Sequence, residues 1–153
     1  MVRELRPDDF GCILNMLRFI KDESPEYAYT SEDDAEYVLS NLKAMYDTGA
    51  LLGVIDEAGR GVMIGALHRQ WYSSRLDAAE QILFVYPPFR GTPLAVRMIR
   101  SFEQIARARG ACTLGVGVTT GIREEQTVSM YQRLGYTPKG YSLSKVLCAT
   151  PLA

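Results

Sequence analysis

A strand that leads through a proline-rich turn into a helix constrains this chain more than any other segment. Residues 81–85 read Gln-Ile-Leu-Phe-Val, two prolines end that strand, and residues 89–95 read Phe-Arg-Gly-Thr-Pro-Leu-Ala at the start of a helix. The first backbone N–H groups of a helix have no partner within it and lie at the positive end of its dipole. Such a turn is therefore suited to binding phosphate groups, and Arg90 adds a cation beside it.

Apolar residues elsewhere in the chain recur at the spacings of further helices and strands. After an N-terminal strand, the predicted elements are a helix capped by Asp8 or Asp9, a helix from Ser31 to about Thr48, strands over 50–56, 62–71 and 77–85, a helix that ends near Gly110, a strand over 112–118, a helix over 123–134 and a strand over 141–147. This order predicts a mixed sheet with helices on both faces.

Two motifs are similar to those of a known family. Residues 90–95 read Arg-Gly-Thr-Pro-Leu-Ala, and residues 131–136 read Tyr-Gln-Arg-Leu-Gly-Tyr. They resemble the phosphate loop Arg/Gln-x-x-Gly-x-Gly/Ala and the last-helix motif Tyr-x-x-x-Gly-Phe/Tyr of the GCN5-related N-acetyltransferase (GNAT) family, in particular its compact, uncharacterised bacterial or bacteriophage-encoded members. The resemblance covers nearly the whole chain. It implies a single acetyltransferase-like domain over 1–153 of α/β (α+β) class, with a mixed, mostly antiparallel twisted sheet, helices on both faces and a splayed central strand pair.

The resemblance also implies acetyl-CoA as the cosubstrate. In the family, the fourth strand pairs with the pantetheine arm and the following turn holds the phosphates. The corresponding residues here are Phe84, Val85, Tyr86, Arg90, Gly91, Thr92, Pro93, Leu94 and Ala95. Thr92 suits the N-cap position and Pro93 the first helical position. Two residues depart from the family: Pro93 replaces a glycine and removes an amide donor, and Glu124 stands where many relatives have an asparagine that bonds the pantetheine.

Tyr131 falls at the position of the family's general acid, where a phenol protonates the leaving thiolate. Glu80 lies at the start of the strand leading to Val85, a position from which some relatives use a glutamate as the base. Its alternation with Ile82 and Phe84 predicts that it shares their apolar face, where desolvation raises the pKa of a carboxyl group. His68, the only histidine, and water are the alternative proton acceptors.

The predicted function is transfer of an acetyl group from acetyl-CoA to a primary amine by direct attack. The alternative is a non-catalytic acyl-CoA-binding or protein-interaction module on the same fold. In the family the acceptor enters beside the loop that corresponds to residues 22–34. Acidic residues mixed with tyrosines in this loop favour a cationic amine. A solvated loop with helix-capping acids would have the same composition. We expect a small-molecule or protein amine, with Tyr27, Tyr29 and Trp71 as candidate contacts.

Composition excludes several other classes of protein. The chain has 153 residues and a formal net charge of −1, which argues against a general binder of nucleic acids or anionic membranes. No apolar run is long enough to span a bilayer, and the N-terminal residues lack the apolar core of a signal peptide, so we expect a cytoplasmic protein. We expect it to be a monomer or a homodimer. Cys12, Cys112 and Cys148 are widely spaced among apolar neighbours, which predicts buried free thiols and no metal site.

Overall fold

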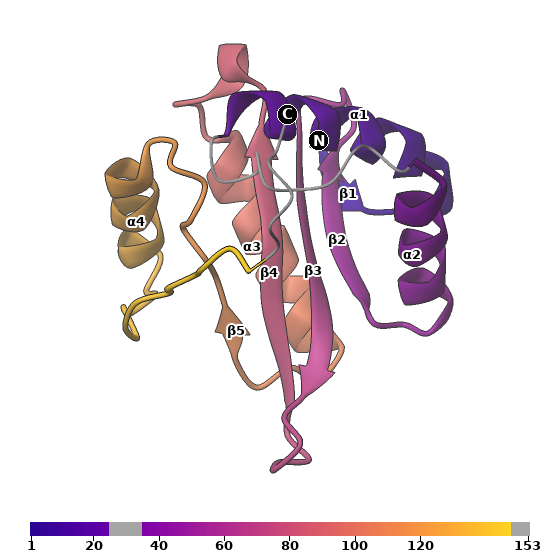
Figure 1. The fold of residues 1–153 in the computed structure, drawn as a ribbon, viewed down its shortest axis with the longest axis vertical. Helices are drawn as coiled ribbons and strands as arrows, with labels where there is room; N and C mark the ends of the chain where they lie inside the picture. Colours follow the sequence, from indigo (N-terminus) through magenta and orange to yellow (C-terminus); the bar gives the residue numbers. More distant parts are fainter. Residues whose placement is uncertain (25–34, 148–153) are drawn as a thin grey trace.

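A sheet of five strands forms the centre of the molecule (Figure 1). The computed structural model describes residues 1–24 and 35–147. In spatial order the strands are β1 (Val2–Glu4), β2 (Leu51–Asp56), β3 (Gly61–Arg69), β4 (Leu76–Val85) and β5 (Leu114–Gly115). The first four pair antiparallel, whereas β4 and β5 are parallel. The helices are α1 (Phe10–Glu23), α2 (Ala35–Asp47), α3 (Leu94–Ala108) and α4 (Glu124–Arg133). The predicted fold class is confirmed.

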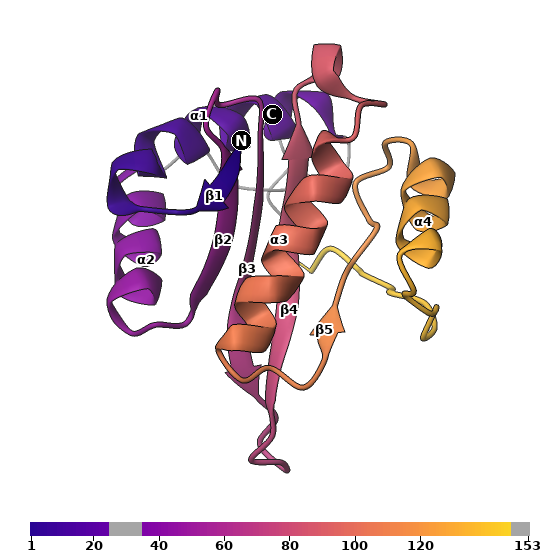
Figure 2. The same cartoon turned by 180° about the vertical axis from the view of Figure 1, so that it is seen from behind.

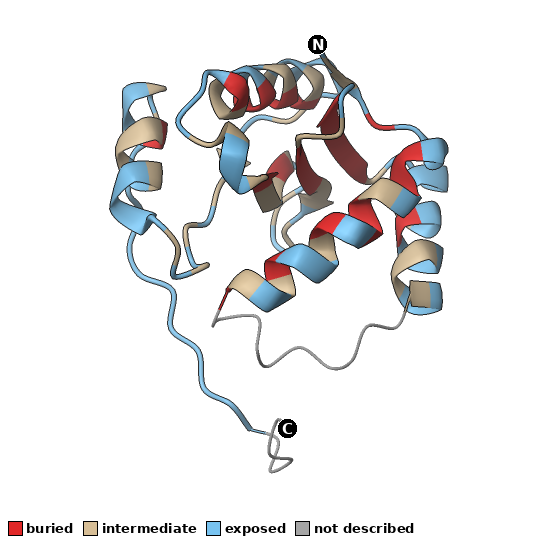
Figure 3. Ribbon diagram, turned by 90° about the horizontal axis from the view of Figure 1, so that it is seen from above, coloured by how far each residue is buried: buried red, intermediate tan, exposed pale blue. Residues whose placement is uncertain are grey.

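Helices cover both faces of the sheet because both faces of its central strands are apolar. Successive side chains of a strand point to opposite sides. One side packs against α1 and α2 and includes Leu51, Ile55, Val62 and Ile64. The other packs against α3 and includes Leu52, Val54 and Met63. Figure 2 shows α3 lying along this second face, and Figure 3 shows the buried residues of the helices turned inward.

The strand β4 contains a bulge. Gly65 of β3 pairs with Glu80, while the adjacent Ile64 pairs with Ile82, so Gln81 is an extra residue in β4. An extra residue reverses the alternation of side chains on either side of it. The two halves of β4 are therefore out of phase, which decides where Glu80 points.

The strands β4 and β5 separate after a short contact. Ala78 pairs with Leu114 and Ala79 with Gly115. Further along, the backbone N–H of Gly117 donates to the carboxylate of Glu80 at 3.0 Å rather than to the backbone of β4. The predicted splay between two central strands is present here (Figure 1).

Two predicted strands differ from the structure. The strand expected over 112–118 is limited to β5, because β4 diverges from it. The strand expected over 141–147 does not form, and Tyr141 and Leu143 are 99% and 93% exposed. Alternating apolar residues supply one face of a strand, but a strand also requires the backbone of a neighbour, and the two residues of β5 offer little.

The predicted burial of the cysteines is also wrong in part. Cys12 is partly buried and Cys112 is exposed, and both are free thiols. Cys148 and the predicted helix start at Ser31 lie outside the described residues. Within those residues, no helix combines the length and the apolar composition that crossing a membrane requires.

Candidate active site

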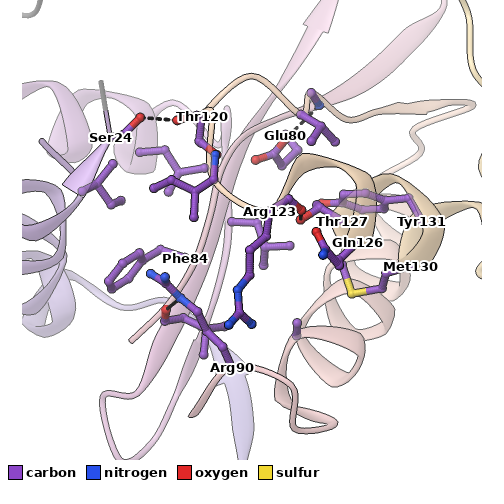
Figure 4. A pocket seen from close by; sticks show the side chains of 18 of the residues that line it. Ser24, Glu80, Phe84, Arg90, Thr120, Arg123, Gln126, Thr127, Met130 and Tyr131 are labelled. Carbon is purple, nitrogen blue, oxygen red and sulfur yellow. Dashed lines mark hydrogen bonds between the residues drawn. The ribbon is translucent and has the colours of Figure 1, made fainter. Parts of the chain in front are cut away.

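A cavity of about 580 Å³ opens where β4 and β5 separate. Its walls come from the end of α1, the second half of β4, the turn before α3, residues 117–123 and α4 (Figure 4). Of the residues predicted for the site, it is lined by Glu80, Phe84, Val85, Arg90, Gly91, Thr92, Ala95 and Tyr131. The structure thus brings the predicted acid, the predicted base and the predicted phosphate turn together in one cleft.

The bulge places Glu80 on the α3 side of the sheet. A Cβ atom at Gly65, its pairing partner, would lie 2.9 Å from the ring of Phe102 on α3, and residues directly opposite in a ladder share a face. Ile82 and Phe84 pack on the α1 side. The prediction that Glu80 shares their face is wrong, because a bulge cannot be read from alternation alone.

Burial changes the acidity of Glu80. Desolvation of its carboxyl group raises its pKa to about 7, opposed by the hydrogen bond from the Gly117 N–H. A Cβ atom at Gly117 would meet nothing within 4 Å, so the backbone here borders open space. A carboxyl group with this pKa both accepts and releases a proton near neutral pH.

The hydroxyl of Tyr131 is buried without a hydrogen-bond partner. The residue is 3% exposed, and within the described part of the chain no group bonds its oxygen. Burial, the nearby Glu80 and Tyr136 raise the pKa of this phenol above its usual value, so it keeps its proton at neutral pH. Buried hydroxyl groups normally have partners. An unpaired O–H that lines a cavity is available to a group bound there.

Arg90, the predicted phosphate ligand, is already engaged. Its two terminal nitrogens donate to the carboxylate oxygens of Glu23, at the end of α1, at 2.5 and 2.6 Å. Its Nε donates to the carbonyl oxygen of Val85 at 2.8 Å, and its guanidinium lies over the ring of Phe84. The same ion pair lowers the pKa of Glu23. The positive charge of Arg90 is therefore neutralised by the protein itself.

The turn before α3 presents mainly backbone to the cleft. Gly91 has φ +77°, a conformation that favours glycine. Pro93, and not Thr92 as predicted, occupies the N-cap position; the Thr92 hydroxyl donates to the carbonyl oxygen of Phe89 at 2.7 Å and accepts from the N–H of Leu94 at 3.4 Å. Leu94 is 2% exposed and packs in the core with α3. Neither Pro93 nor Leu94 lines the cavity.

The backbone of β4 offers fewer groups than the sequence predicts. The N–H of Tyr86 donates to the carbonyl oxygen of Arg60, so it is used within the protein. Alternate residues of an antiparallel strand direct their backbone groups to the same neighbour. Phe84 and Tyr86 therefore face β3, while Leu83 and the N–H of Val85 face the gap toward β5. Leu83, which the sequence analysis missed, lines the cleft, whereas Tyr86 does not.

The sequence analysis also missed the other cleft residues of α4 and the residue before it. Arg123, Gln126, Thr127 and Met130 line the cleft with Tyr131 (Figure 4). Their spacing is that of one face of a helix, so the signal was present once Tyr131 was placed there. Glu124 points elsewhere and accepts a hydrogen bond from the N–H of Gly121 at 3.0 Å.

The remaining predicted residues lie apart from the cleft. Trp71 is 94% exposed, follows β3 and contacts Tyr72 in an edge-to-face arrangement. His68 is paired with Asp77 near the opposite end of β4 from Val85, and does not line the cavity. Tyr27 and Tyr29 lie outside the described residues. In the part of the chain that is described, no group of three or more His, Cys, Asp or Glu could hold a metal ion.

Comparison with known proteins identifies the family to which this fold belongs. The model of the acetyltransferase (GNAT) family matches residues 2–136. The chain belongs to this family. A search of curated proteins finds no match.

Solved structures share the fold. An aminoglycoside acetyltransferase from an uncultured soil metagenomic sample matches with a TM-score of 0.72 and 17% identity, covering 97% of this chain and 98% of the other. Glucosamine-6-phosphate N-acetyltransferase from Arabidopsis thaliana gives 0.72 at 12% identity, covering 97% and 98%. A GCN5-related N-acetyltransferase from Ralstonia eutropha gives 0.71 at 15% identity, covering 95% and 97%. At these identities the likeness concerns the fold alone.

Proposed function

We propose that this protein is an N-acetyltransferase that moves an acetyl group from acetyl-CoA to a primary amine by direct attack. The observation that carries the proposal is the unpaired Tyr131 hydroxyl, buried in the same cleft as a Glu80 carboxyl group whose pKa is about 7. Membership of the GNAT family supports the reaction class. The cleft offers the backbone of Leu83 and Val85 to the pantetheine amides, and the N–H groups of Gly91 and Thr92 to the phosphates.

Glu80 and Tyr131 divide the proton transfers between them. The neutral amine forms a bond to the carbonyl carbon of the thioester, and Glu80, as a carboxylate, accepts the proton that the nitrogen loses. The C–S bond breaks, and Tyr131 donates its proton to the departing thiolate. Protonated Glu80 and the Tyr131 phenolate then return to their starting states by proton exchange with solvent. Burial keeps the Tyr131 phenol protonated, as its role requires, and a pKa of about 7 leaves part of Glu80 as the carboxylate that a base requires at neutral pH.

The acceptor is a small-molecule or protein amine. Glu80 lines the cleft, and the negative charge of its carboxylate form attracts a cationic amine. Tyr27 and Tyr29 remain candidate contacts, while Trp71 would require a large acceptor that reaches beyond the cleft. We place this activity in the cytoplasm, in a monomer or a homodimer of a single domain over 1–153.

A non-catalytic acyl-CoA-binding module is the second candidate. The neutralised charge of Arg90 and the amide lost at Pro93 favour it, because both weaken the family's phosphate turn. Such a module needs no general base. In such a module, Glu80→Gln would change only the affinity for acyl-CoA.

The test is turnover with acetyl-CoA and a panel of primary amines, with free CoA thiol and acetylated product both measured. The wild type should form product, with kcat/KM falling below about pH 7 as Glu80 is protonated. Glu80→Gln should remove that acidic limb, and the matched variant His68→Gln should retain it. Loss of the limb in His68→Gln alone would assign the base to His68. Acetyl-CoA binding without product from any amine would favour the binding module.

A further inference from the structure

Three arginines line the cleft, and their surroundings differ. The Nε of Arg133 donates to the carbonyl oxygen of Ser129 at 3.3 Å. Arg90 donates from all three guanidinium nitrogens, to both carboxylate oxygens of Glu23 and to the carbonyl oxygen of Val85. The side chain of Arg123, an exposed residue that lines the same cleft, has no hydrogen bond or ion pair within the described residues. Figure 4 shows its side chain extending from the start of α4 toward Arg90.

The backbone at Arg123 is unusual. Its φ of 49° and ψ of 41° are left-handed, and among the described residues it is the one non-glycine with positive φ. Such a conformation is uncommon for a side chain with a Cβ atom and is often found where function requires it. The surrounding turn holds it in place, because Gly121 N–H donates to Glu124 at 3.0 Å and Thr127 N–H to the Arg123 carbonyl oxygen at 3.0 Å.

The unpaired guanidinium shares the cleft with unpaired backbone donors. Within the described residues, the N–H groups of Gly91 and Thr92 have no acceptor, and both residues line the same cavity. N–H groups at the start of a helix and a guanidinium are both suited to phosphate oxygens. The Arg123 guanidinium on one wall and the free N–H groups of Gly91 and Thr92 on the other form an anion site. The Glu23–Arg90 pair stays intact.

We propose that Arg123, and not Arg90, is the arginine that binds the pyrophosphate of the acyl-CoA cosubstrate. Arg90 instead fixes the end of α1 against the phosphate turn through Glu23. The assignment rests on the proposed function for the identity of the ligand. It explains how the cleft compensates for an arginine that is already neutralised and for the amide missing at Pro93.

The test compares acetyl-CoA with acetyl-pantetheine, which lacks the phosphates. Affinities of both ligands are measured by calorimetry at fixed salt for the wild type, Arg123→Gln, Arg90→Gln and a control, Arg100→Gln, which removes an exposed charge of α3 outside the cleft. We expect Arg123→Gln to weaken acetyl-CoA about 10-fold or more and to leave acetyl-pantetheine unchanged. Arg90→Gln should weaken acetyl-CoA less, and Arg100→Gln by under about 2-fold. The acetyl-CoA affinity of Arg123→Gln should also depend less steeply on salt.

The outcomes separate this assignment from the proposed function. Equal acetyl-CoA affinity in Arg123→Gln and wild type overturns the assignment and leaves the cosubstrate intact. An equal loss for both ligands, or a larger loss in Arg90→Gln that spares acetyl-pantetheine, also overturns it. Failure of the folded wild type to bind acetyl-CoA at all overturns both.

Discussion

The two walls of the cleft are built in opposite ways. On the wall formed by α1 and the phosphate turn, polar side chains are paired: Glu23 with Arg90, and the Ser24 hydroxyl with the Thr120 carbonyl oxygen at 2.5 Å. On the wall formed by α4, the guanidinium of Arg123 and the hydroxyl of Tyr131 have no partner within the described residues.

The paired side chains join segments of the protein to one another, whereas the unpaired groups are free to bind a ligand. A buried polar group without a partner costs stability, whereas a paired group contributes to it. The paired wall should therefore be important for folding, and the α4 wall for binding and turnover. Substitutions on the two walls test this division, since each side predicts a different readout.

The largest effect is expected for Tyr131→Phe on the α4 wall. Removing only the hydroxyl oxygen should lower kcat by about two to four orders of magnitude, because the leaving thiolate loses its proton donor. Stability should stay equal or rise, since the oxygen removed is buried and unpaired. Steady-state kinetics and urea unfolding measure the two quantities. Retained turnover, or a clear loss of stability, would make Tyr131 a packing residue.

Glu80, which lies between the two walls, should link stability to pH. Its pKa is about 7 in the folded protein and near 4.5 in the unfolded chain, so the folded state binds a proton that the unfolded state releases between these values. Stability relative to Glu80→Gln should therefore fall as pH rises from about 4.5 to 7, by up to about 3 kcal/mol, and change little above that. Urea midpoints of both proteins at four pH values measure this. Parallel curves would mean that Glu80 is solvated.

The smallest effect is expected for Glu23→Gln on the paired wall. The two side chains of the pair are 21% and 25% exposed, so losing the charge should lower the free energy of unfolding by about 2 kcal/mol. Affinity for acetyl-CoA should not fall, because the substitution releases the charge of Arg90. A pronounced loss of affinity with unchanged stability would reverse the roles of the two walls. Lys43→Gln, which breaks an exposed pair with Asp47 on α2, is the matched control.

Most of the fold could be predicted from the sequence because local signals coincide with tertiary packing. The apolar face of α3, with Met98, Ile99 and Phe102 fully buried, repeats at helical spacing. The strand predicted over 141–147 does not form. Alternating apolar residues describe one face of a strand and give no information about whether a neighbouring strand is present to pair with it. A short segment has the same pattern whether or not a neighbouring strand is present.

The site was predicted less completely, for a similar reason. Position in a motif identified Tyr131 and the turn, and both line the cleft. The Glu23–Arg90 pair joins residues 67 positions apart, and no local pattern reports it. The side on which Glu80 lies depends on one extra residue in β4. Arg123 has a left-handed backbone conformation that is uncommon for arginine, so residue propensity does not predict it.

The bulge at Gln81 makes β4 sensitive to changes in length rather than to changes in composition. Deleting this one residue would leave every other side chain present and yet rotate residues 76–80 by half a turn relative to 82–85. The carboxyl group of Glu80 would then turn from the α3 side to the α1 side, and Ala78 would lose its bond to the Thr113 carbonyl oxygen. A design that deletes one residue at this position would therefore preserve the composition of the strand while removing Glu80 from the cleft.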